Sequence, residues 1–421
     1  MNICLVTSTF LPELTGVSTH LQNLANHFSR LGHKVLLLCP DYGVEKEIYP
    51  DYLKYRGELF PNVTVRPAPS QKNRRRPESV NYREGTSWKL EEAIGDFRPD
   101  IIQVDDPDRI YGVGLFGLEE TIAYNGAIGV AYAKANNIPV IGFYQTNYAA
   151  FADYYIPKDV PTPYRMDPAG VYRKVYGLYD AVLCSCGDAY RRLKEHGLEK
   201  VRQGTYMGVH EAVLQSDESS PLIPRSKKIK ILYSGRFDGG KDVKIVVDIF
   251  RKAHGENSQL QLFLAGSGLR DTMEYVSGVC SETPDIHYVG NLDMQALAKV
   301  YNSVDIYFSP HGTDTLGLSI IEAMSKGLPV VASDRGGPAS LIDSGRNGIL
   351  CAGEEAFVRH ILALSADKGY RRAIGEQAEN DAKKYSGKNC AANLISTYGE
   401  LIERLGQNEC LEEEECIKQA L

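Results

Sequence analysis

The sequence contains no apolar run long enough to cross a bilayer and no basic segment that could begin a secretory signal. A membrane-spanning helix needs about 20 consecutive apolar residues, whereas this chain starts Met1-Asn2-Ile3 and passes directly into a short apolar stretch. A signal peptide would place positive charge ahead of that stretch. We therefore expect a cytoplasmic protein, peripheral at most to the cytoplasmic face of a membrane.

The chain also lacks paired cysteine spacings and an excess of positive charge. Its nine cysteines are odd in number and scattered from Cys4 to Cys416, and even Cys184 and Cys186 match no zinc or redox spacing. We interpret all nine as reduced thiols, and we predict no metal and no cofactor. The net charge of −7 argues against general binding to nucleic acid, which requires a basic surface.

The length of 421 residues suits two domains better than one core. Apolar runs alternate with helical patterns, which is typical of parallel sheets flanked by helices. The polar, proline-containing stretch 211–228 interrupts the alternation and predicts a linker. We expect a first domain at 1–212, a second at 225–385, a helix at 388–405 that packs back on the first domain, and a solvated tail at 406–421.

Each predicted domain is an α/β unit with a Rossmann-like, doubly wound parallel sheet, and the two sheets face each other across a cleft. The predicted strands of the first domain lie at 2–8, 34–39, 101–104, 139–144 and 181–186, and those of the second at 229–234, 260–265, 286–289, 305–309 and 330–333.

The stretch 309–333 carries the most information about chemistry. A buried strand ends in a glycine-bearing loop, an amphipathic helix follows, and Pro329 opens another strand. The backbone N–H groups of Leu316, Gly317 and Leu318 are predicted to be the unpaired donors of the first helical turn, which suits an anion. The carboxylates of Asp314 and Glu322 would then accept hydrogen bonds from hydroxyl groups on either side. A molecule with sugar, diphosphate and ribose in line fits this arrangement.

Two cations follow the first predicted strand of the second domain. The loop Gly235-Arg236-Phe237-Asp238-Gly239-Gly240-Lys241 presents a guanidinium and an ammonium at a strand end, a combination that suits a diphosphate. When this loop is considered alone, a solvated surface loop with two cations explains it better. For Gly266-Ser267-Gly268, a tight turn between strand and helix is an equally good explanation. At 287–291, backbone groups could form hydrogen bonds with a nucleotide base, but an ordinary strand end explains this stretch as well.

Taken together, in this order and spacing, these features resemble the retaining glycosyltransferases of the two-Rossmann-domain (GT-B) type, glycosyltransferase family 4. That family has an acidic residue, seven residues, Glu-Ala-Met, then Gly-x-Pro-Val-Val-Ala-Ser and Gly-Gly, which is matched from Asp314 through Gly336-Gly337. Its Gly-Arg and Lys element matches Arg236 and Lys241. The stretch 10–20, followed by 32–35, is similar to the family's first loop and helix.

The resemblance implies retaining transfer of a hexose from a nucleotide-diphosphate sugar, without metal, to an acceptor bound by the first domain. The catalytic residues would be Arg236 and Lys241, which grip the diphosphate, and Asp314, which orients the sugar. Glu322 would hold the ribose, and Gly16 would let the first loop approach the phosphates. The remaining implied donor contacts are Gly235, Gly266, Val289, Thr315, Leu316, Gly317 and Leu318.

Several positions depart from the family pattern. The family commonly has Glu where this chain has Asp314, and many members have His where this chain has Gln145. Glutamine cannot act as a general base, but it can position a hydroxyl or a phosphate. Asp105, Asp106 and Asp108 follow a first-domain strand and could bind the acceptor or cap a loop.

The acceptor is predicted to be a membrane lipid or a lipid-linked glycan, with a soluble sugar or sugar phosphate as the alternative. Gln71 to Pro77 is a cationic loop, and Arg74, Arg75 and Arg76 could contact an anionic membrane, since each basic residue there contributes about 1 kcal/mol. Lipid-glycosylating relatives with a loop like Thr313 to Thr315 point the same way.

Three other functions compete with this interpretation. Asp106-Pro107-Asp108 matches the Asp-x-Asp metal motif of the other large glycosyltransferase fold. That interpretation would leave the second domain without a role. Nucleotide-sugar 2-epimerases share the two-domain architecture but need further acid or base residues. A nicotinamide-binding protein is excluded because the first strand leads into Thr9-Phe10-Leu11-Pro12 and not into Gly-x-Gly-x-x-Gly.

Overall fold

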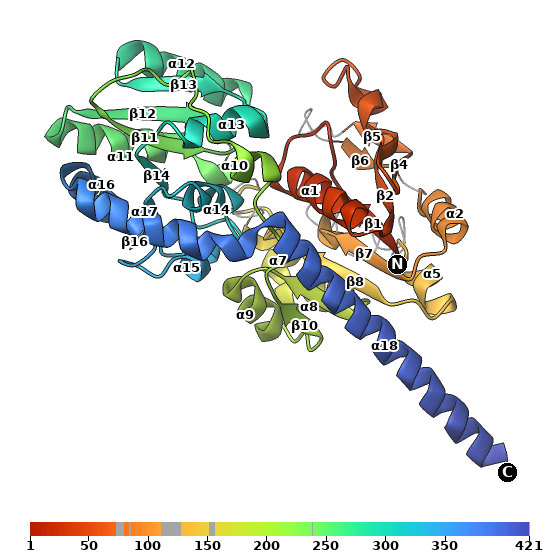
Figure 1. Cartoon of the computed structure of the whole chain (residues 1–421). Helices are drawn as coiled ribbons and strands as arrows, with labels where there is room; N and C mark the ends of the chain where they lie inside the picture. The colour runs from red at the N-terminus through yellow and green to blue at the C-terminus, as the bar shows by residue number, and fades with distance from the viewer. Residues whose placement is uncertain (73–79, 84–85, 111–127, 151–155, 238, 421) are drawn as a thin grey trace.

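The computed structural model describes residues 1–72, 80–83, 86–110, 128–150, 156–237 and 239–420 of the chain. They form two α/β domains, each built on one mainly parallel sheet (Figure 1). The predicted fold class, two Rossmann-like doubly wound domains that face each other, is confirmed.

The sheet of the first domain has eight strands in the order β10-β9-β8-β7-β1-β2-β4-β3. All neighbours are parallel except the edge pair β3 and β4. Its central strands are buried along nearly their whole length, as expected when helices cover both faces. The strands are β1 (Asn2–Thr7), β2 (Lys34–Pro40), β3 (Gly57–Phe60), β4 (Val63–Ala68), β7 (Ile101–Asp105), β8 (Val140–Tyr144), β9 (Ala181–Cys184) and β10 (Val201–Gln203). A separate hairpin joins β5 (Ser70–Lys72) and β6 (Val80–Tyr82).

The sheet of the second domain has six parallel strands in the order β13-β12-β11-β14-β15-β16. They are β11 (Ile229–Ser234), β12 (Leu260–Ala265), β13 (Ile286–Gly290), β14 (Ile306–Ser309), β15 (Val330–Ser333) and β16 (Ile349–Cys351).

In both sheets the chain starts in the middle and builds outward in both directions. β1 lies between β2 and β7, and β11 lies between β12 and β14. Ligands of open α/β sheets bind beyond the carboxyl ends of the strands at such a switch point. The loops that follow β1, β7, β11 and β14 are therefore the places where a site is expected.

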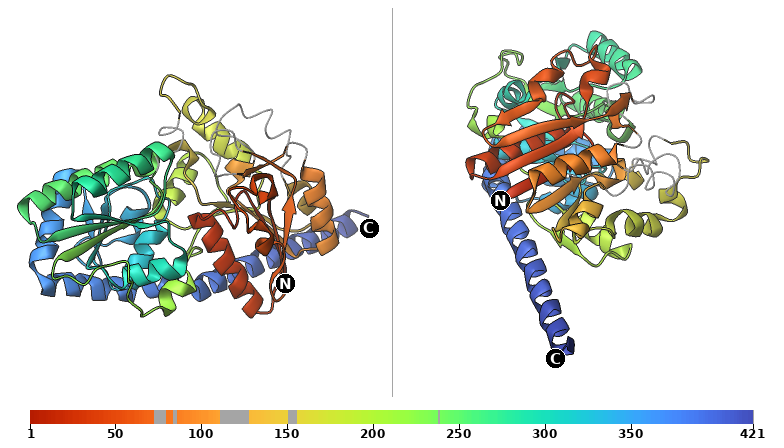
Figure 2. Two further views of the ribbon diagram at one scale, coloured as in Figure 1. Left: turned by 90° about the horizontal axis from the view of Figure 1, so that it is seen from above. Right: turned by 90° about the vertical axis from the view of Figure 1, so that its right-hand side faces the viewer.

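Helices flank both sheets, as the views in Figure 2 show. In the first domain they are α1 (Gly16–Arg30), α2 (Ser87–Phe97), α3 (Pro107–Ile110), α5 (Val130–Ala135), α7 (Pro163–Met166), α8 (Pro168–Tyr176) and α9 (Gly187–Glu195). The later helices are α10 (Glu211–Gln215), α11 (Val243–Glu256), α12 (Arg270–Glu282), α13 (Met294–Tyr301), α14 (Leu318–Ser325), α15 (Gly336–Leu341), α16 (Glu354–Ala366), α17 (Lys368–Ala382) and α18 (Gly387–Ala420).

The long helix α18 joins the two domains. It follows α17 of the second domain, packs against α1 of the first and projects beyond it (Figures 1 and 2). Its Tyr398 is fully buried, and the hydroxyl donates to Gln103 Oε1 at 2.6 Å. The helix continues to Ala420, whereas the sequence analysis ends it at residue 405 and expects a tail.

Two further differences concern short elements. The predicted linker 211–228 contains the helix α10, which packs against α13 and α14. The strands β3 to β6, β10 and β16 are absent from the sequence analysis because each has only three to six residues and several carry polar side chains. The seven cysteines in the part of the chain described with side chains are free thiols, and all but Cys280 are buried.

Candidate active site

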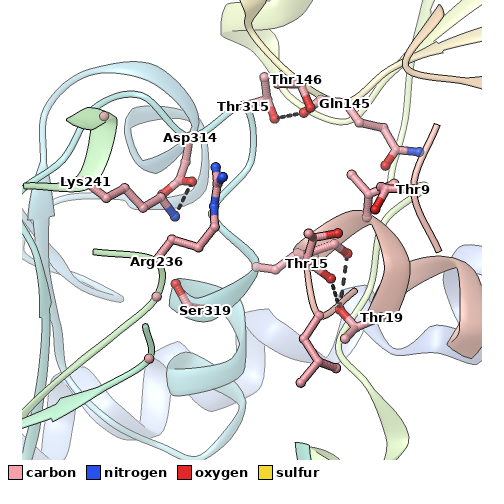
Figure 3. Close-up of a pocket in the computed structure, with 18 of the residues that line it drawn as sticks. Thr9, Thr15, Thr19, Gln145, Thr146, Arg236, Lys241, Asp314, Thr315 and Ser319 are labelled. Carbon is pink, nitrogen blue, oxygen red and sulfur yellow. Dashed lines mark hydrogen bonds and ion pairs between the residues drawn. The ribbon is translucent and has the colours of Figure 1, made fainter. Parts of the chain in front are cut away.

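A cavity of about 490 Å³ lies between the two domains at both switch points. The first domain contributes the loops after β1 and β7 and the start of α1. The second domain contributes the loops after β11, β12 and β14 and the start of α14. In Figure 3, Arg236, Lys241 and Asp314 stand on one side of this space, and Thr9, Thr15, Thr19 and Gln145 stand on the other.

The two predicted cations reach the cavity from the loop after β11. Arg236 and Lys241 both line it, and Lys241 Nζ forms an ion pair with Asp314 Oδ1 at 2.7 Å. Thr313 Oγ1 donates to the carbonyl of Gly240 at 2.9 Å and ties this loop to the loop after β14. The structure therefore brings together Arg236, Lys241 and Asp314, the three residues predicted to be catalytic.

Glycines allow these loops to approach one another closely. A Cβ atom on Gly266 would lie 1.8 Å from the carbonyl oxygen of Gly235, and one on Gly337 would lie 2.6 Å from the backbone of Leu316. Gly337 N also donates to the carbonyl of Asp314 at 2.7 Å. The Gly336-Gly337 pair thus holds the loop that carries Asp314.

The helix after this loop starts later than the sequence analysis predicts. Gly317 is its N-cap with a left-handed φ of 91°, and α14 begins at Leu318. Leu316 and Gly317 therefore precede the first turn, and of the three predicted donors only Leu318 belongs to it. The cause is the glycine, because a left-handed residue ends the loop and cannot continue a helix. All three residues, together with Thr315, still line the cavity.

Glu322 lines the cavity from the helix α14. Its side chain is buried, and Tyr301 donates its hydroxyl to Glu322 Oε2 at 2.9 Å. Burial raises the pKa of Glu322 from 4.5 to about 7, although the Tyr301 hydrogen bond and the charge of Lys241 oppose the shift. The carboxyl therefore holds a proton more tightly than an exposed glutamate does.

The first domain contributes Gly16 and a group of acidic residues. Gly16 is the first residue of α1, and a Cβ atom there would lie 3.5 Å from Leu318 of the second domain. Asp106 has a left-handed φ of 49° and accepts from Thr146 N at 2.9 Å and Thr146 Oγ1 at 2.7 Å. Asp108 accepts from the hydroxyl of Tyr176 at 2.9 Å, and burial raises the pKa of Asp108 to about 7.

Two predicted contacts do not reach the cavity wall. Asp105 is fully buried, and its carboxylate accepts hydrogen bonds from the side-chain amides of Gln103 and Gln145. It supports Gln145, while Asp108 lines the cavity in its place. Val289 lies on the edge strand β13 and is not among the lining residues.

Gln145 connects the two domains at this site. Its backbone carbonyl accepts a hydrogen bond from Thr315 Oγ1 of the second domain (Figure 3). Its side-chain nitrogen donates to Asp105, and its side-chain oxygen has no hydrogen-bond partner although the residue is only 4 % exposed.

The sequence analysis missed several lining residues. Thr9 follows β1 directly, and its place beyond a central strand could have marked it. Glu13, Asn291 and Met294 also line the cavity, and only Asn291 lies near a strand end that the sequence analysis singled out. Met294 stands at the start of α13 and carries no signal that separates it from a core residue.

Three further predictions concern a membrane contact, a membrane span and a metal site. Arg74, Arg75 and Arg76 lie outside the described residues. In the described part of the chain, no helix is long and apolar enough to cross a membrane, and no group of three or more His, Cys, Asp or Glu side chains is placed to hold a metal ion.

Comparison with known proteins places this geometry in context. Residues 215–381 match the family model described as glycosyl transferases group 1, and residues 15–204 match the glycosyl transferase 4-like domain. The chain is 25% identical over 356 residues to a GDP-mannose-dependent alpha-mannosyltransferase of Corynebacterium glutamicum, covering 83% of this chain and 76% of that protein. It is 26% identical over 379 residues to the alpha-monoglucosyldiacylglycerol synthase of Streptococcus pneumoniae, covering 86% and 78%.

The fold is also similar to that of solved structures. HepE of Anabaena, crystallised with UDP and glucose, superimposes with a TM-score of 0.66 at 15% identity and covers 94% of this chain and 99% of that one.

The raised pKa of Glu322 predicts a pH-dependent stability. Between pH 4.5 and about 7 the folded state binds a proton that the unfolded state has released, so stability falls as the pH rises through this range. At ~1.4 kcal/mol per pH unit, the loss amounts to about 3 kcal/mol. From pH 5 to pH 8, the free energy of unfolding, measured by urea denaturation, should fall in wild type because Glu322 loses its proton. In Glu322→Gln this fall should be smaller by roughly 2 to 3 kcal/mol.

The exposed Glu274 of α12 offers a matched control, because its side chain is 63% exposed. Glu274→Gln should follow the wild-type pH dependence. If Glu322→Gln follows it as well, Glu322 is ionised in the fold at neutral pH and the assignment of its pKa is wrong.

Proposed function

This chain belongs to the group 1 glycosyl transferases, and we propose that it transfers a hexose from a nucleotide-diphosphate sugar to an acceptor hydroxyl with retention of anomeric configuration. The observation that carries the proposal is the placement of Arg236, Lys241 and the first turn of α14 around one end of the cavity. These groups are suited to a diphosphate.

The relatives support the choice of donor. The mannosyltransferase depends on GDP-mannose, as its name states, and HepE was crystallised with UDP and glucose. In the proposed pose the diphosphate lies against Arg236 and Lys241, the ribose hydroxyls reach Glu322, and the sugar lies beside Asp314. The second carboxylate oxygen of Asp314 is buried without a hydrogen-bond partner, so a sugar hydroxyl would satisfy it.

The proposed chemistry is cleavage of the bond between the anomeric carbon and the diphosphate. Negative charge grows on the leaving oxygen, and Arg236, Lys241 and the helix N-terminus would stabilise it. The acceptor oxygen then bonds to the anomeric carbon on the same face, and its proton passes to the departing phosphate. We propose that this transfer needs no divalent metal, because the two cations supply the charge that a metal would supply.

Removal of either cation should slow the reaction. Arg236→Ala and Lys241→Ala should each lower kcat by about 100-fold or more, as expected when one donor to a developing oxyanion is lost. The measurement is nucleotide release from a donor first identified by thermal shift on a panel of nucleotide sugars. Arg270→Ala is the control, since the Arg270 side chain is 89% exposed on α12. Near-normal turnover in a folded Arg236 or Lys241 variant would refute the diphosphate assignment.

The stereochemistry and metal dependence can be tested on one reaction. NMR of the product should show the anomeric configuration of the donor, and an excess of chelator should leave the initial rate unchanged. Sugar found on a second molecule, and not isomerised on the nucleotide, establishes transfer. An inverted product contradicts the retaining mechanism, and a rate lost with chelator and restored by a divalent cation contradicts metal independence.

We further propose a cytoplasmic enzyme that acts on a membrane lipid or a lipid-linked glycan, with a soluble sugar acceptor as the alternative. The lipid-glycosylating relative of Streptococcus supports this, as do the clustered cations Arg74, Arg75 and Arg76. The neighbouring Lys72 contributes less than the sequence suggests, because its ammonium is paired with Glu45 at 2.9 Å.

Binding to vesicles tests the membrane contact. Wild type should sediment with phosphatidylglycerol-containing vesicles at low salt and be released at high salt, because a Debye length shrinks from about 30 Å at 0.01 M to about 3 Å at 1 M. The variant with Arg74, Arg75 and Arg76 changed to Ser should stay in the supernatant, and vesicles of phosphatidylcholine alone are the control. Wild type that remains soluble at low salt rules out this contact.

A further inference from the structure

Charge is divided unequally between the two walls of the cavity. Among the described residues that line it, the basic side chains are Arg236 and Lys241, and both belong to the second domain. The first-domain wall carries the carboxyl groups of Glu13, Asp106 and Asp108 and has no lysine, arginine or histidine within the described lining. The second-domain wall also carries Glu322 and Asp314, and Asp314 pairs with Lys241 at 2.7 Å. Among the described lining residues, an anionic group would therefore find cationic partners on the second-domain wall and none on the first.

The first-domain wall also contains two buried acceptor atoms without partners. Gln145 is 4% exposed and Asp108 is 1% exposed, and neither Gln145 Oε1 nor Asp108 Oδ1 has a hydrogen-bond partner. A buried polar atom left unpaired costs about 1 to 3 kcal/mol. Both residues line the cavity, so a ligand there can supply a donor that the protein does not.

The orientation of both groups is fixed by their other contacts. The amide nitrogen of Gln145 donates to the Asp105 carboxylate, so the oxygen must be the atom that remains available. The other carboxylate oxygen of Asp108 accepts from Tyr176 at 2.9 Å. The Tyr164 hydroxyl, which has no other partner, lies beside Asp108 and lowers the pKa of that carboxyl as a hydrogen-bond donor. Gln145 Oε1 is therefore the acceptor atom of this wall that requires a donor from a ligand.

We infer that the acceptor presents an uncharged polyhydroxyl group, a sugar ring or a polyol without phosphate, to the first-domain wall formed by Glu13, Asp108 and Gln145. The inference rests on the proposed glycosyl transfer and specifies its acceptor. A hydroxyl group supplies the donor that Gln145 Oε1 lacks. A phosphate would bring further acceptor oxygens to a wall that already presents acceptors, and it would find no cation among the described residues of this wall.

Matched acceptor pairs test the inference. The probes are methyl glucoside, methyl mannoside and myo-inositol, each with and without one phosphate, assayed with the donor that gives the largest thermal shift. We expect transfer to at least one neutral probe and a kcat/KM at least 10-fold lower for its phosphorylated twin. Octyl glucoside and octyl mannoside form a second arm, because their preference over the methyl glycosides identifies a lipid-borne sugar and the reverse identifies a free one.

Substitutions at the wall give an independent readout. Asp108→Asn places an amide nitrogen beside the cavity, and it should raise KM for the neutral acceptor about 10-fold. Leu14 lines the cavity and is 47% exposed, so Leu14→Arg adds a cation without burying it. Leu14→Arg should reduce about fivefold the ratio of kcat/KM between a neutral acceptor and its phosphorylated form. Leu14→Gln, which is of similar length and uncharged, should leave that ratio unchanged.

The outcomes separate the inference from the function on which it rests. Wild type that neither binds nor hydrolyses any nucleotide sugar overturns the proposed function and the inference with it. Donor hydrolysis combined with equal or better use of the phosphorylated twins overturns the inference alone. Donor hydrolysis without transfer to any neutral probe does the same.

Discussion

A chain of buried hydrogen bonds between the domains is the constraint on which the cavity depends. Tyr398 of α18 donates to Gln103, Gln103 donates to Asp105 at 3.2 Å, and Asp105 accepts from the side chain of Gln145. The backbone carbonyl of Gln145 in turn accepts from Thr315 of the second domain. Buried polar groups need partners, so these contacts fix how α18, β7 and the loop after β14 lie relative to one another.

This chain of contacts explains why Asp105 is buried. Burial raises the pKa of Asp105 well above its ordinary range, while the donors on Gln103 and Gln145 act against that shift. The carboxyl group serves to orient two amides, and one of them faces the cavity. A residue that the sequence places in a cluster of acids thus supports the site from behind it.

The sequence predicts the parts of this protein that depend on periodicity and on strand ends. Continuous apolar runs identified the central strands such as β1 and β11, and the residues that follow them, Arg236 among them, line the cavity. Short strands such as β5, with the sequence Ser-Gln-Lys, were not predicted because they have no apolar pattern.

Side-chain orientation was beyond the sequence analysis. Asp105, Asp106 and Asp108 are nearly adjacent, yet Asp105 faces inward while the other two line the cavity. Asp106 has a left-handed backbone, which turns the chain between β7 and α3. The start of α14 depended in the same way on the backbone of one residue, Gly317. The order of residue types along the chain does not show at which residue the backbone turns in this way.

The ion pair between Lys241 and Asp314 bears on how the two ends of the proposed donor would be recognised together. Lys241 and Asp314 are paired at 2.7 Å, and each side chain is at most 20% exposed, so each satisfies a charge that would otherwise be costly to bury. A diphosphate that becomes the partner of Lys241 would release Asp314 Oδ1, and with the already unpartnered Oδ2 the whole carboxylate would then be available to sugar hydroxyls. A free nucleotide without the sugar would leave the Asp314 carboxylate without a partner. A free sugar would leave Lys241 paired with Asp314. In the proposed function, the ion pair would therefore favour a ligand that carries diphosphate and sugar in one molecule over either fragment alone.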